Sequence, residues 1–154
     1  MFSIGDKVLY PMHGAGIIEA IEEKKVLGET KSYYILHIGT LSLMVPVDGD
    51  SAGLRAIVEH PEIQRAMEEL AAPSTEMDEN WNRRNRENME HLKTGDICEV
   101  AKVVRNLMRV DKIKKLSSGE KKLLQNAKQI LASEIALVEC IADCEALEMI
   151  NGQV

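Results

Sequence analysis

Residues 6–21 read DKVLYPMHGAGIIEAI: an apolar segment, a turn between Pro11 and Gly16, and a second apolar segment. Val, Ile and Tyr favour extended chain, whereas Pro and Gly favour turns. Two similar segments follow, SYYILHI from Ser32 and LSLMVPV from Leu41, each bounded by turn residues. Short strands at this spacing, with no helix between them, predict a small, strongly bent antiparallel β-barrel.

From about Leu54 the hydrophobic period changes to that of a helix. The predicted helices lie at 60–72, from the N-cap Asp78 to about Lys93, after the N-cap Asp96, after a Ser-x-x-Glu capping box at Ser117 and Glu120, and from about Asp143 to Ile150, ending before Gly152. The fold class is therefore α+β. We expect a barrel over about 1–53 and an all-helical domain over about 54–154.

The composition is that of an ordinary globular protein of 154 residues, with 45% hydrophobic and 29% charged residues. No apolar run approaches the roughly 18 residues of a membrane helix, and the N-terminus does not resemble a signal peptide, so we expect a cytoplasmic protein. Three cysteines fit a reducing compartment. Cys140 and Cys144 lack a further Cys or His at zinc-like spacing, so we expect no metal and no cofactor.

Charge is unevenly distributed along the chain. The net charge is −6, yet residues 81–128 hold 13 lysines and arginines against 6 acidic residues. Such segregation indicates a local anion-binding surface, whereas a merely solvated surface usually mixes the two signs. Both interpretations stay open at this level.

Two basic patterns lie within this span. One is a stripe spaced by three, four and three residues along the third predicted helix, Lys102, Arg105, Arg109 and Lys112. The other is the pair Lys121 and Lys122 in the first turns of the fourth helix, where cations oppose the helix dipole. Phosphate contacts would explain both patterns, although long lysines can also extend into solvent at little cost.

The only tryptophan, Trp81, lies in the polar segment ENWNRRNREN, residues 79–88. It could pack at a core edge beside Met77 and Leu92, because tryptophan is mostly buried on average. It could instead be an apolar wedge flanked by arginines, a known means of opening or bending nucleic acid. The neighbouring arginines could also form plain i, i+4 ion pairs, Arg83–Glu87 and Arg86–Glu90.

Catalytic motifs are not recognisable. The histidines at 13, 37, 60 and 91 are scattered, and no nucleophile–base pair is apparent. The sequence HGAG at 13–16 is followed by a strand and not by a helix N-terminus, so its glycines are interpreted as turn residues. We therefore do not expect an enzyme.

Three segments in order resemble the CarD/CdnL family of bacterial transcription regulators: GDKVLYPMHGAGIIEAIEE (5–23), NWNRRNRENMEHLKTGD (80–96) and LSSGEKKLLQNAKQILASEIAL (116–137). The N-terminal part also resembles the polymerase-interacting domain of the transcription-repair coupling factor, a Tudor-like barrel. The resemblance implies that the barrel binds the RNA polymerase β subunit. It also implies that the helical domain contacts promoter DNA at the upstream edge of the transcription bubble and stabilises the open complex.

Carried over residue by residue, the resemblance makes Trp81 a minor-groove wedge and assigns DNA-contacting basic positions to Arg83, Arg86 and Lys121. On the polymerase side it assigns one basic position to Lys24. A second position that is often basic is Met44 here, which implies a more apolar or weaker contact. The family's frequent aromatic residue four positions after the tryptophan is Asn85 here. We expect a monomer with no small-molecule substrate.

The alternative is a non-catalytic module that recruits proteins or binds RNA without touching promoter DNA. Tudor-like folds can recognise modified side chains through an aromatic cage. The aromatic residues available for such a cage are Phe2, Tyr10, Tyr33 and Tyr34.

Overall fold

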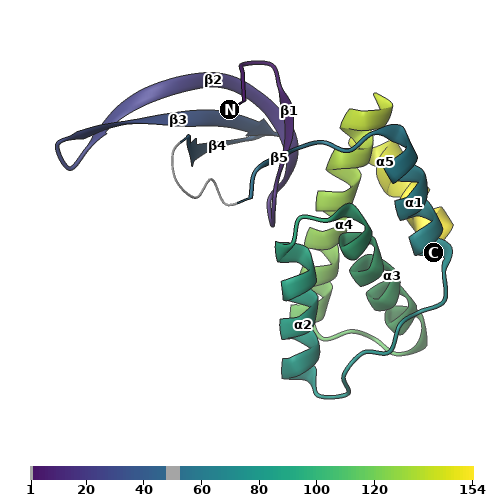
Figure 1. Ribbon diagram of the computed structural model, residues 1–154. Helices are drawn as coiled ribbons and strands as arrows, with labels where there is room; N and C mark the ends of the chain where they lie inside the picture. Colours follow the sequence, from purple (N-terminus) through teal and green to yellow (C-terminus); the bar gives the residue numbers. More distant parts are fainter. Residues whose placement is uncertain (1, 48–52) are drawn as a thin grey trace.

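The computed structural model describes residues 2–47 and 53–154, in which an N-terminal antiparallel sheet is followed by a helical domain (Figure 1). The predicted α+β class is confirmed. The strands are β1 Lys7–Tyr10, β2 Gly14–Val26, β3 Glu29–Ile38, β4 Leu41–Pro46 and β5 Arg55–Ala56. The helices are α1 His60–Ala71, α2 Trp81–Lys93, α3 Ile97–Ile113, α4 Ser118–Glu139 and α5 Asp143–Gln153.

The strands form one sheet in the order β4-β3-β2-β1-β5, and neighbouring strands pair antiparallel. A register shift between Ile18 and Ala20 marks an irregularity of the kind that increases the local twist and bend. One face encloses a small apolar core, which comprises Val8, Ile18, Tyr34, Leu36, Val45 and Leu54. The β2–β3 hairpin extends away from the helices (Figure 1).

Strand β5 corrects one expectation. The helical period was predicted from about Leu54, but Arg55 and Ala56 pair with Leu9 and Val8 of β1. A two-residue strand is too short to show a period of two in the sequence. The division of the chain near residue 53 stays a prediction.

The helix boundaries follow the predicted caps with three exceptions. The N-cap of α2 is Asn80, whose side chain accepts from the N–H groups of Asn82 and Arg83, so the assignment to Asp78 is wrong. Asp78 instead accepts from the backbone N–H of Asn80. Helix α5 continues through Gly152 to Gln153 instead of ending before the glycine.

The third exception is the capping box of α4. The Ser117 hydroxyl accepts from the Glu120 N–H at 3.3 Å, as predicted. The Glu120 side chain does not return to Ser117, because it pairs with Arg84 of α2. The predicted N-cap of α3, Asp96, is confirmed by its bonds to the N–H groups of Cys98 and Glu99.

The sheet packs closely on α4 through the segment Gly14–Gly16. The Ala15 N–H donates to the Ser133 hydroxyl at 2.8 Å. A β-carbon on Gly16 would lie 2.2 Å from the carbonyl oxygen of His37, so only glycine fits there. The turn interpretation is therefore incomplete, because this glycine serves a close approach of two strands.

An ion pair between a partly exposed arginine and a buried glutamate joins the sheet to the helices. Arg55 of β5 donates to both carboxylate oxygens of Glu134 on α4, at 2.7 and 2.9 Å. It also donates twice to the carbonyl of Gly95, which follows α2. The Glu134 side chain is 2% exposed and accepts a further bond from the N–H of Val58. One arginine of the sheet thus holds both α4 and the end of α2.

Two negative findings apply to the described part of the chain. None of its helices combines the length and apolarity that membrane crossing requires. Across residues 2–47 and 53–154, no three His, Cys, Asp or Glu side chains lie together in a way that could hold a metal ion.

Candidate nucleic-acid interface

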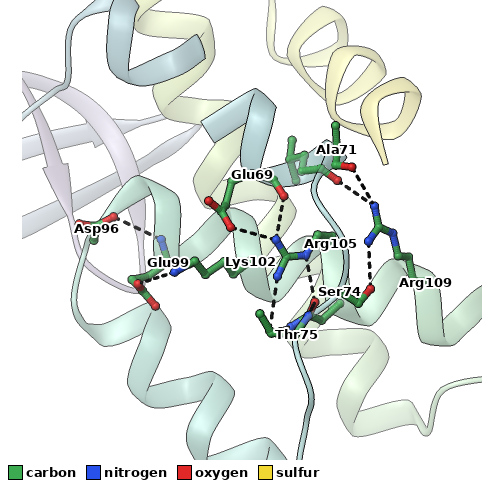
Figure 2. A network of polar contacts seen from close by, with 11 residues as sticks. Glu69, Ala71, Ser74, Thr75, Asp96, Glu99, Lys102, Arg105 and Arg109 are labelled. Carbon is green, nitrogen blue, oxygen red and sulfur yellow. Dashed lines mark hydrogen bonds and ion pairs between the residues drawn. The ribbon is translucent and has the colours of Figure 1, made fainter. Parts of the chain in front are cut away.

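The basic stripe of α3 ranges from a fully buried side chain, Arg105, to an exposed one, Lys112. Arg105 is fully buried, and its guanidinium donates to the backbone carbonyl and the carboxylate of Glu69 at 2.9 and 3.0 Å (Figure 2). Its Nε donates to the side-chain oxygen of Asn106. A phosphate could not reach this side chain, so the prediction that Arg105 contacts DNA is wrong.

The other members of the stripe also have partners within the protein. Arg109 donates to the Ser74 hydroxyl at 3.0 Å and reaches the carbonyls of Leu70 and Ala71 at the end of α1 (Figure 2). Helix α1 has no basic residue in its own last turn, where cations are favourable. The stripe therefore supplies the positive charge that α1 lacks.

At the two ends of the stripe, the lysines make weaker contacts. Lys102 donates to Glu99 at 3.2 Å, and this hydrogen bond raises the pKa of Lys102. Lys112 reaches the carbonyl of Val154 at 3.4 Å. The two arginines of the stripe are thus engaged by the protein itself, whereas the two lysines keep much of their exposure.

Trp81 is the first residue of α2 and lies at the surface. Its side chain is 44% exposed and is not part of either apolar core. The indole Nε1–H donates to the Ser117 hydroxyl at 3.1 Å. The ring also lies against Gly119, where a β-carbon would come within 3.4 Å of Cζ2. Trp81 therefore rests on the beginning of α4 and does not fill a core.

An ion pair that the sequence did not indicate joins α2 to α4. Arg84 donates to both carboxylate oxygens of Glu120, at 2.9 and 2.7 Å, and the two side chains are 14% and 4% exposed. The hydrogen bond to Glu120 raises the pKa of Arg84. Local reasoning predicted a capping role for Glu120, because its partner Arg84 lies 36 residues away in the chain.

The remaining predicted DNA contacts lie in the first two turns of α2 and the first turn of α4. Arg83 and Arg86 are exposed, and in the described part of the chain neither forms an ion pair, not even with Glu87 or Glu90. Lys121 is partly exposed in the first turn of α4. We call Trp81, Arg83, Arg86, Ser117 and Lys121 the α2/α4 corner.

The two predicted polymerase positions lie on one face of the sheet. Lys24 of β2 is opposite Lys31, and Met44 of β4 is opposite Ile35. Side chains alternate along β3, so Lys31, Tyr33 and Ile35 share this face, opposite the core face that holds Tyr34. Met44 is 46% exposed. Lys31 was missed, because only the strand register places it beside Lys24.

An aromatic cage is not favoured by this arrangement. Tyr34 is 2% exposed, and its ring meets Phe2 edge-on with the centroids 6.1 Å apart. Tyr33 points to the other face of the sheet, and Tyr10 stacks on His13. These four aromatic residues do not surround one shared opening.

The whole-chain comparisons agree with this two-part arrangement of a sheet and a helical domain. Residues 2–58 match the CarD-like/TRCF RID domain, and residues 65–151 match the CarD C-terminal domain. The chain belongs to the CarD family, as its sequence motifs indicated. A relative from Bacillus subtilis (strain 168), named "Putative transcription factor YdeB", is 40% identical over 146 residues, covering 93% of this chain and 95% of the relative. Both comparisons support a role in transcription regulation.

Proposed function

We propose that this protein regulates transcription, without catalysing a reaction, by binding the RNA polymerase β subunit and stabilising the open promoter complex. The α2/α4 corner contacts DNA at the upstream edge of the bubble, and Trp81 enters the minor groove as a wedge. The observation that carries this proposal is the 44% exposure of Trp81 at the start of a helix whose cations Arg83 and Arg86 are also exposed and form no ion pair within residues 2–47 and 53–154. The family membership and the polymerase-interacting domain support it.

The chemistry of the corner suits an unwound duplex. Arg83, Arg86 and Lys121 would neutralise phosphates without reading base sequence. The indole of Trp81 would fill the gap where two base pairs separate. Unstacking a base step costs a few kcal/mol, so a wedge that blocks restacking slows closure of the bubble.

On the polymerase side, the outer face of the sheet would bind an acidic surface of the β subunit. Lys24 and Lys31 lie directly opposite each other on adjacent strands. Like charges in this position are unfavourable, and an acidic partner would relieve their repulsion. Met44 would add an apolar contact. The protein would act in the cytoplasm as a monomer on the polymerase, without a cofactor.

Trp81→Ala tests the DNA half of the proposal. Because Trp81 lies outside the apolar cores, the melting temperature and polymerase binding should change little. The lifetime of open promoter complexes, measured by competitor challenge, should shorten several-fold. Trp81→Phe, which keeps an aromatic ring, should retain part of the effect. A large drop in melting temperature, or an unchanged lifetime, would contradict the wedge.

Lys24→Glu tests the polymerase half in the full-length chain. Charge reversal at the proposed contact should weaken retention on the β subunit and leave binding to a forked duplex unchanged. Lys25→Glu is the matched control, because Lys25 is the next exposed residue of β2 and its side chain points to the opposite face of the sheet. If retention is lost while Trp81→Ala has no effect on open complexes, the protein is a recruiting module that does not act on promoter DNA.

A further inference from the structure

The Ser117 hydroxyl occupies a junction between the two helices of the corner. It accepts from the indole N–H of Trp81 at 3.1 Å and from the backbone N–H of Glu120 at 3.3 Å. The backbone carbonyl of Ser117 accepts from the N–H of Lys121 at 2.9 Å. One residue therefore caps the helix that carries Lys121 and holds the ring of the exposed tryptophan.

The bond from Trp81 to Ser117 is one of two parallel links. The second is the ion pair between Arg84 and Glu120. Trp81 and Arg84 are three positions apart on α2, and the N-cap Ser117 is three positions before Glu120 of α4. Residues at this spacing lie on the same side of a helix. The ion pair fixes the distance between the helices, and the hydroxyl then meets the indole at hydrogen-bonding distance.

We propose that Ser117 is a positioning residue for Trp81, which sets the orientation of the indole before DNA binds. This inference rests on the proposed function, because it assigns Ser117 a part in the action of the wedge. A half-exposed side chain at the first position of a helix normally exchanges rotamers in picoseconds to nanoseconds. The bond to Ser117 and the contact with Gly119 restrict that exchange.

Restricting the ring in advance strengthens the wedge without any added contact to DNA. Immobilising a free side chain on binding has an entropic cost, and a ring that is already oriented avoids part of it. For one side chain this cost corresponds to a change of roughly two- to ten-fold in a binding constant. We therefore expect the loss of the Ser117 hydroxyl to shorten the lifetime of open complexes within this range.

The first experiment uses the free protein. Trp81 is the only tryptophan, so intrinsic fluorescence reports on this ring alone. Ser117→Gly removes the hydroxyl, and glycine replaces serine at an N-cap at little cost in helix stability. The fast component of the time-resolved anisotropy should grow about two-fold, as expected for free rotamer exchange. Ser117→Thr, which keeps a hydroxyl, and Ser118→Gly, the same change one residue further on, should leave it unchanged.

The second experiment measures open-complex lifetime and separates positioning from capping. In the Trp81→Phe background the ring has no N–H group, so Ser117→Gly should cause no further shortening. Equal shortening in both backgrounds would show that Ser117 acts through the helix cap, which would overturn the proposal. An anisotropy decay of Ser117→Gly identical to that of the unmodified protein would also overturn it.

The failure of the proposed function would appear differently. In that case Trp81→Ala would leave open-complex lifetime unchanged, whatever the anisotropy of the Ser117 variants. An increased fast component in Ser117→Gly would then show that the hydroxyl holds the ring while the ring does not act on promoters.

Discussion

The basic stripe of α3 and the α2/α4 corner both contain cations at helical spacing, but their arginines lie in different environments. Both place cations three or four residues apart on one side of a helix, and both lie in the positively charged span. Arg105 in the stripe is fully buried, whereas Arg83 and Arg86 in the corner are exposed. Helical spacing thus shows which residues share a face, but not what that face contacts.

The packing of α3 against the end of α1 explains the difference. The last carbonyls of α1 and the carboxylate of Glu69 lie over the stripe and accept its hydrogen bonds (Figure 2). No helix of the described chain ends in this way over Arg83 or Arg86. A cation can bind an external phosphate only where the protein has not already supplied its partners.

The largest expected effect is on the buried member of the stripe. Arg105→Ala removes a fully buried side chain together with its hydrogen bonds to Glu69 and Asn106. We expect the free energy of unfolding to fall by roughly 3–4 kcal/mol, as measured by urea denaturation. Arg83→Ala is the control and should change it by less than about 0.5 kcal/mol. Similar losses of unfolding free energy for Arg105→Ala and Arg83→Ala would show that the two arginines do not differ in their structural role.

A smaller loss is expected at the ion pair between Arg84 and Glu120, which joins the two helices of the corner. Glu120→Gln leaves the guanidinium of Arg84 without its charged partner, and we expect the free energy of unfolding to fall by about 2–3 kcal/mol. If the weakened pair lets α2 move relative to α4, the emission of Trp81 should also change. If the fluorescence is unaltered, Ser117 holds the ring without help from the ion pair.

Arg109 is partly buried, between the buried Arg105 and the exposed Arg83. Its hydrogen bonds to the carbonyls at the end of α1 are long, at 3.4 Å. Arg109→Ala should lower the free energy of unfolding by about 1 kcal/mol. The salt dependence of DNA binding should not change, since this guanidinium already has partners within the protein. A reduced salt slope would return Arg109 to the DNA-contacting surface.

The smallest effects on stability are expected at the exposed cations of the corner. Arg86→Ala and Lys121→Ala should each alter the free energy of unfolding by less than about 0.5 kcal/mol. Each should lower the slope of the logarithm of the DNA-binding constant against the logarithm of salt concentration by about one unit. Lys112→Ala, in the stripe, should leave the slope unchanged. An unchanged slope for Lys121→Ala would remove Lys121 from the interface.

The sequence predicts features of this molecule that depend on neighbours along the chain. The α+β class follows from local periodicity. The Asp96 cap could be predicted because its side chain accepts from the N–H of Cys98, only two residues further along the chain. The choice of Asp78 over Asn80 failed because two good capping residues lie two positions apart. Strand β5 is too short to have a period.

Features that depend on distant partners were not predictable in this way. Glu120 and Arg105 both meet groups 36 residues away, and no local pattern distinguishes a buried arginine from an exposed one. Trp81, Arg83, Arg86 and Lys121 were identified through the family motifs, and their role on DNA stays a prediction. Their link through Ser117 required the packing of α2 on α4.

The bonds of Arg55 between the sheet and the helices have a consequence for which promoters the protein would act on. Arg55 bonds to Glu134 of α4 and to the carbonyl of Gly95 after α2, and these bonds favour one distance and one angle between Lys24 and Trp81. DNA rotates by roughly 34–36° and advances by about 3.4 Å with each base pair. On the proposed function, a bubble whose upstream edge is displaced by one base pair would present its groove to Trp81 at the wrong angle. The protein would then distinguish promoters by the length and phase of their opened region, without reading a single base.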